Sequence, residues 1–116
     1  MFDSVSFVAL SSALDGLSLR QRTIAENVAN IQTPGYQAKR VSFEDALSRA
    51  VDNGSAAEAA TVPTVARSLE PTREDGNNVN LDTETLLNVD TNLRYQLATQ
   101  AIDGTFSSIR TAMRTS

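Results

Sequence analysis

An apolar stripe at helical spacing runs from residue 7 to residue 31. Its members recur alternately three and four positions apart, which is the pattern of one face of an amphipathic α-helix. The stripe predicts a helix over residues 4–31, about 40 Å long at 1.5 Å per residue. A helix of that length needs neighbours along its apolar face, so the pattern favours helices packed on helices. The positions of the stripe are Phe7, Leu10, Leu14, Leu17, Gln21, Ile24, Val28 and Ile31, of which Gln21 alone is polar.

A second stripe occupies the other end of the chain and predicts a helix over residues 80–116. Asn80 or Asp82 is expected to cap this helix, because a side-chain oxygen there satisfies free N–H groups of the first turn. Glu84 lies in that first turn, where the helix dipole favours a carboxylate. The apolar members are Leu86, Val89, Leu93 and Leu97 and, after a shift of one position, Ile102, Phe106, Ile109 and Met113.

The middle of the chain carries weaker signals. Residues 42–51 predict a short helix that Ser42 caps. Its inward side is expected to consist of Phe43, Leu47 and Val51. The stretch between this helix and the second stripe mixes Gly, Pro, Ala, Thr, Asn and charged residues without a sustained period, which indicates a flexible connector.

We therefore expect one all-α domain with three segments. Residues 1–36 supply the N-terminal helix and its end, residues 37–79 the short helix and the connector, and residues 80–116 the C-terminal helix. The two long helices are expected to form a coiled-coil-like pair. Because two such stripes cannot cover each other completely, we expect the ends to be disordered in the free monomer and to fold on assembly.

The first helix ends in an explicit turn, TPGY. Pro34 supplies the fixed φ and Gly35 the positive φ of a type II β-turn. Asn27 and Asn30 lie one helical turn apart and can bond free carbonyls or the turn backbone. The sequence thus indicates a rigid corner, and Tyr36 is expected to project from it as an intersubunit contact.

Composition excludes several classes of function. A formal net charge of -4 leaves no basic surface for nucleic acid, and direct lipid binding is not expected either. The chain has no Cys and no His, so thiolate nucleophiles, His bases and the usual structural zinc sites are absent. No Walker loop, dinucleotide fingerprint or calcium loop occurs. We expect no catalytic residue, no cofactor and no metal.

The remaining charged residues suit helix surfaces better than catalysis. Glu44 and Asp45 are adjacent, and consecutive helical residues point to different sides. Lys39 and Arg40 are expected to lie in a solvated loop. The N-terminus lacks the basic segment of a signal peptide, and no apolar run is long enough to span a bilayer, which favours a cytosolic protein or one exported without a cleaved signal.

Two motifs resemble a known family. The stretch ENVANIQTPGY fits the pattern A-x-N-[IVL]-A-N-x-x-T-P-G-[YF] of the bacterial flagellar rod and hook family, and NVNLDTETLLNVDTNLRYQLATQAI is similar to the closing helix of its small rod proteins. Larger relatives insert β domains between the helices, so the short middle segment favours a membrane-proximal rod subunit. Residues 52–76 lie outside the resemblance. The residues that match the first pattern are Ala25, Asn27, Val28, Ala29, Asn30, Thr33, Pro34, Gly35 and Tyr36.

The resemblance implies a structural subunit of the flagellar basal body. It implies export from the cytoplasm through the flagellar type III apparatus and assembly into the torque-transmitting rod in the periplasm. The expected partners are further copies of the chain, other rod proteins, the rod-to-membrane-ring adaptor and the membrane ring. The expected intersubunit residues are Phe7, Leu10, Leu14, Leu17, Ile24, Asn27, Val28, Asn30, Thr33, Pro34, Gly35, Tyr36, Leu86, Leu93, Tyr95, Leu97, Ile102, Phe106 and Ile109.

One alternative belongs to another class of protein. A cytosolic coiled-coil adaptor or regulator would use the same apolar stripes to form a closed helical oligomer. The TPGY corner and the loose connector favour the rod subunit instead, because a closed coiled coil needs neither.

Overall fold

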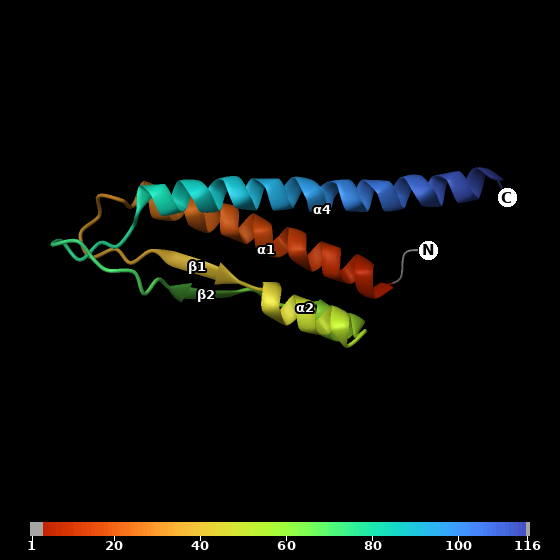
Figure 1. The fold of residues 1–116 in the computed structure, drawn as a ribbon, viewed down its shortest axis with the longest axis horizontal. Coiled ribbons are helices and arrows are strands. Elements are labelled where there is room, and N and C mark those ends of the chain that lie inside the picture. The colour runs from red at the N-terminus through yellow and green to blue at the C-terminus, as the bar shows by residue number, and fades with distance from the viewer. Residues whose placement is uncertain (1–3, 116) are drawn as a thin grey trace.

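A computed structural model describes residues 4–115 of the chain. The molecule is elongated, with principal extents of 66 × 26 × 14 Å. The N-terminal and C-terminal helices lie antiparallel, and the sheet and the short helix after its first strand lie on the side of the N-terminal helix that faces away from the C-terminal one (Figure 1). The elements are α1 (Ser4–Ala29), β1 (Lys39–Ser42), α2 (Glu44–Asp52), α3 (Ala56–Ala59), β2 (Thr64–Arg67) and α4 (Leu81–Thr115).

The two long helices form where the apolar stripes predict them. The first helix, α1, ends at Ala29 and gives way to turns, while α4 begins at Leu81. Asn80 caps α4: its Oδ1 accepts the backbone N–H of Asp82 at 3.0 Å and that of Thr83 at 3.3 Å. Of the two caps that the sequence allows, Asn80 or Asp82, the structure forms the Asn80 cap. The two helices lie side by side (Figure 1), whereas coiled-coil geometry stays a prediction.

The fold is mostly helical, as expected, but it is not all-α, because the middle segment contains a small two-stranded sheet. Strands β1 and β2 pair antiparallel, with Lys39 opposite Arg67 and Ser42 opposite Thr64. The expected connector also contains α3, so it is not without secondary structure. All residues of β2 are exposed, and its sequence, TVAR, does not show the alternation of apolar and polar residues by which a half-buried strand is recognised.

The short helix is also rotated from the expected orientation. Ser42 is the last residue of β1, and Phe43 occupies the N-cap position without a side-chain capping bond. Phe43 does face inward, but Val51 is 45% exposed and Ala50 is buried in its place. Since Ala50 packs near Ala9 of α1, the small side chain lets α2 approach α1 closely.

The apolar core is small and lies between α1 and the middle segment. One cluster joins Leu17 of α1 to Val41 of β1 and to Phe43, and Tyr95 of α4 packs against it. The ring of Phe43 occupies the space beside Gly16, where any side chain would collide with it. The core therefore fixes the sheet and α2 on one side of α1 and leaves the opposite side to α4.

Candidate assembly surfaces

The apolar stripe of α4 faces away from α1 in its N-terminal half. Four large apolar side chains there are more than half exposed, and we call them the outer stripe. They are Leu86 (72%), Val89 (62%), Leu93 (55%) and Leu97 (58%).

The face of α4 that packs on α1 is more polar than the outer stripe. Glu84 and Thr91 are fully buried there, and Leu87, Tyr95 and Ile102 are half-buried. Side chains three and four positions apart share one face of a helix, so this row is continuous. The pairing of α1 with α4 thus leaves the outer stripe uncovered by the residues that the structure describes.

Several residues expected at subunit contacts lie inside the chain. Leu17 and Ile24 are buried, and so is Asn27. By contrast, the side chains of Phe7 and Val28 on α1 are exposed. The expected residues with half-buried side chains are Leu10, Leu14, Asn30, Tyr36, Tyr95 and Ile102, and those with exposed side chains also include Thr33, Pro34, Leu86, Leu93, Leu97, Phe106 and Ile109.

The corner has the geometry that the sequence indicates. The Tyr36 N–H donates to the Thr33 carbonyl at 3.2 Å, and Gly35 has a φ of +76°. These are the hydrogen bond and the positive φ of a type II turn. The Asn30 side chain donates to the Glu26 carbonyl at 2.8 Å, which closes the last turn of the helix.

Tyr36 does not project from the corner as expected. Its hydroxyl turns inward and donates to Asn27 Oδ1 at 3.3 Å. Burial of the ring, followed by the negative charges of Glu26 and Glu84, raises the pKa of the Tyr36 hydroxyl above its usual value. The half-buried side chain thus supports the corner through its hydroxyl, and its role as an intersubunit contact stays a prediction.

A second loop, residues 71–80, is bonded to the corner. Asn77 is fully buried, and its side-chain amide donates to the carbonyls of Asn30 and Thr33, both at 2.8 Å. The Gly35 N–H donates to the Asp75 carbonyl at 2.8 Å. The TPGY corner and loop 71–80, far apart in the chain, therefore form one structural unit at the end of the molecule.

Beneath the corner lies a buried polar cluster. The carboxylate of Glu84 is fully buried and accepts hydrogen bonds from Arg40 at 2.6 Å and from Asn27 at 3.2 Å. The other guanidinium nitrogen of Arg40 donates to Glu70 at 2.8 Å. Arg40 thus lies in an ion-pair network and not in a solvated loop, and Glu84 does more than compensate the helix dipole.

Asn27 also completes the free edge of β1. Its amide donates to the Lys39 carbonyl and accepts the Lys39 N–H, both at 3.0 Å. Farther along the same edge, Arg20 donates to the Val41 carbonyl at 2.7 Å. Side chains of α1 therefore take the place of a third strand, as buried backbone groups require.

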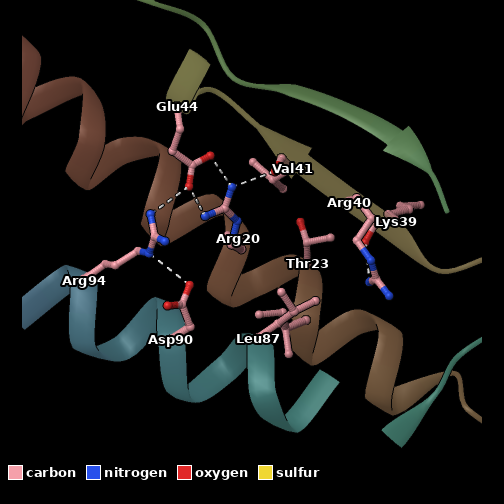
Figure 2. Close-up of a pocket in the computed structure, with 10 residues that line it drawn as sticks. Arg20, Thr23, Lys39, Arg40, Val41, Glu44, Leu87, Asp90 and Arg94 are labelled. Carbon is pink, nitrogen blue, oxygen red and sulfur yellow. Dashed lines mark hydrogen bonds and ion pairs between the residues drawn. The ribbon is translucent and has the colours of Figure 1, made fainter. Parts of the chain in front are cut away.

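The pocket in Figure 2 holds charged groups that satisfy one another. Arg20 donates hydrogen bonds to both carboxylate oxygens of Glu44, at 2.5 and 2.7 Å. Arg94 forms ion pairs with Glu44 at 3.6 Å and with Asp90 at 2.9 Å. The hydrogen bond from Arg20 lowers the pKa of the Glu44 carboxyl. A carboxylate held by two arginines is a poor general base. The pocket measures about 240 Å³ and is lined by residues of α1, β1, α2 and α4, so its ion pairs connect these elements rather than form a catalytic site.

The described part of the chain offers no cluster of three or more side chains that could hold a metal ion. Neither long helix, over the residues described, combines the length and apolarity that a bilayer crossing needs.

Comparison with known proteins links these motifs to one family. A family model described as flagella basal body rod protein matches residues 8–37. The flagellar basal body rod protein FlgB of Escherichia coli (strain K12) is 32% identical over 79% of this chain and 80% of its own length. FlgB of Borrelia hermsii is 30% identical over 87% of this chain and 90% of its own length. FlgB of Bacillus subtilis (strain 168) is 29% identical over 90% of this chain and 89% of its own length.

Proposed function

We propose, because the chain belongs to the FlgB family of flagellar basal body rod proteins, that its copies assemble through their long helices into the torque-transmitting shaft of the proximal rod. Membership of this family makes the chain a structural rod component and not an enzyme. Self-assembly and the transmission of torque are the proposed steps.

The outer stripe is the observation that carries this proposal. Burial of a large apolar side chain stabilises by roughly 1.5–3 kcal/mol, so four exposed ones on one helix face favour association with another apolar surface. The stripe lies on a long helix that the corner and the buried cluster hold in place. A rigid helix with an uncovered apolar face suits a stiff assembly.

The proposed route and partners follow from the family. We propose that the chain leaves the cytoplasm through the flagellar type III apparatus and assembles in the periplasm. Its proposed neighbours are other copies, other rod proteins, the rod-to-membrane-ring adaptor and the membrane ring. The helix ends of the free monomer are proposed to be disordered and to order in the assembly.

The proposal is tested by sedimentation velocity and circular dichroism over a wide range of protein concentration. We expect Leu93→Asp to abolish growth of large species, because it places a charge in the outer stripe. Thr99→Asp is the matched control, since Thr99 is exposed on the same helix outside the stripe and the change adds the same charge.

The competing closed adaptor gives a different result in the same experiment. A helical dimer or tetramer that stays constant in size as concentration rises would contradict the rod assembly. Equal behaviour of Leu93→Asp and the parent protein would remove the outer stripe from the proposal.

A further inference from the structure

We infer that the basic C-terminal end of α4 docks into an apolar groove between α1 and α2 of a second copy. The inference rests on the proposed self-assembly and names two surfaces that the outer stripe does not include. It is carried by shape, apolar lining and opposite charge on two parts of the chain that cannot meet within one molecule.

The groove has a largely apolar lining and one acidic side chain without an ion pair in the described residues. It measures about 540 Å³ and lies open to solvent between the N-terminal half of α1 and α2. Leu10, Leu47 and Val51 line its floor. Asp52, the last residue of α2, also lines the groove and has no ion pair within the residues described. Such a groove suits an amphipathic helix that carries basic residues.

The end of α4 has these complementary properties. The Phe106 ring meets Phe7 edge-on with ring centroids 6.4 Å apart, and α4 continues beyond this contact to Thr115 (Figure 1). Ile109 is 47% exposed on this extension. Arg110 and Arg114 follow without an acidic residue among them, and neither has a carboxylate partner in residues 4–115.

The geometry of the fold excludes docking within one molecule. Figure 1 places α1 between α4 and α2, and the end of α4 points away along the long axis. A continuous helix cannot turn back across α1 to reach the groove. The groove can therefore receive this extension only from another copy.

Two different patches in contact make a heterologous interface. Each copy then keeps a free helix end on one side and a free groove on the other, so addition continues into a ring or an open helix. A self-complementary contact would instead stop at a dimer. The inferred contact therefore supplies the directional step that a growing shaft requires.

A mixing experiment tests the contact directly. Val51→Glu blocks the groove and keeps the helix end, while Ile109→Glu blocks the helix end and keeps the groove. We expect each variant alone to associate at least tenfold more weakly than the parent protein. A mixture of the two is expected to form a heterodimer, because one intact helix end meets one intact groove. Absence of any heterodimer in the mixture overturns the inference.

A charge exchange provides a second test that leaves apolar packing untouched. Asp52→Arg is expected to weaken association about tenfold, and Arg110→Glu on the same chain is expected to restore it. Circular dichroism of every variant checks that the helices remain. If the exchange fails to restore association and salt has no effect on it, the charge complementarity is refuted.

The outcomes separate this inference from the proposed function. If Leu93→Asp prevents assembly while Val51→Glu and Ile109→Glu assemble normally, rod assembly through the outer stripe stands and the docking contact is wrong. If none of the three changes assembly, both are wrong.

Discussion

The ring of Phe43 lies so close to Gly16 that a Cβ atom at residue 16 would stand 2.5 Å from Phe43 Cδ1. Phe43 precedes α2 and Gly16 lies inside α1, so this contact sets how closely the middle segment packs on the helix. The guanidinium of Arg20 covers the same ring, 5.0 Å from its centroid. Glycine at residue 16 is therefore required by packing, at the expense of intrinsic helix stability.

Gly16→Ala is expected to destabilise the folded chain by about 1–3 kcal/mol, since the added methyl group forces the Phe43 ring or α1 to move. Gly104→Ala is the matched control. Nothing lies within 4 Å of a Cβ at residue 104, so this change is expected to stabilise α4 by up to about 1 kcal/mol. Urea denaturation measures both. Equal effects of the two substitutions would contradict the packing role of Gly16.

The ion pair of Arg40 and Glu84 gives a second prediction. Arg40→Met leaves the fully buried Glu84 carboxylate without its cation, and the expected loss is about 3–5 kcal/mol. Glu84→Gln added to Arg40→Met is expected to recover part of this loss, because the buried charge is then gone. The double-mutant cycle is measured by chemical denaturation at neutral pH.

Glu70→Gln is the control for this pair. Glu70 is the other partner of Arg40, but it is partly exposed and its removal is expected to cost less than about 1 kcal/mol. A loss as large as that of Arg40→Met would mean that the exposed ion pair, and not the buried one, holds β1 in place.

Local signals in the sequence predicted the ends of the chain well. Asn80 caps α4, and Gly35 has the positive φ of the turn. Both features could be predicted because each depends only on residues a few positions away in the sequence. The outer stripe was also visible as a helical period. Its direction was not, because the sequence does not say which face of α4 meets α1.

Contacts between distant segments account for what the sequence did not predict. The burial of Glu84 depends on Asn27, a residue 57 positions earlier, and on Arg40. Strand β2 was missed because each of its residues is exposed. Asn77 and Asn78 look like loop residues, yet both are buried because their amides bond backbone groups of other segments. No local period encodes such partners.

Low pH is expected to weaken the ion pair between Arg20 and Glu44. Arg20 holds the folded-state pKa of this carboxyl below its usual value of 4.5, mainly by hydrogen bonding. A lowered folded pKa means that the carboxylate stabilises the fold above the unfolded pKa and that this stabilisation is lost as pH falls through the folded pKa.

The stability difference between the parent protein and Glu44→Gln should therefore shrink as pH is lowered below 4.5. Because the Glu44 side chain is 39% exposed, the effect is expected to be modest and to decrease with salt. Asp45→Asn is the matched control, since Asp45 is an exposed neighbour without an ion pair in the described residues. A constant difference between parent and Glu44→Gln across this pH range would contradict the prediction.

Removal of the Asn77 side chain tests whether the two loops at the corner are one unit. Asn77→Ala removes one of the two donors to each of the Asn30 and Thr33 carbonyls and leaves the buried Val79 N–H without its acceptor, Asn77 Oδ1. The expected loss is about 2–3 kcal/mol. Hydrogen exchange should then speed up at the Gly35 N–H as well, although its own bond to Asp75 is untouched. Asn88→Ala, an exposed change on α4, is expected to leave both measurements unaltered. Faster exchange confined to residues next to position 77 would mean that the loops open independently and that the corner keeps its shape without its partner.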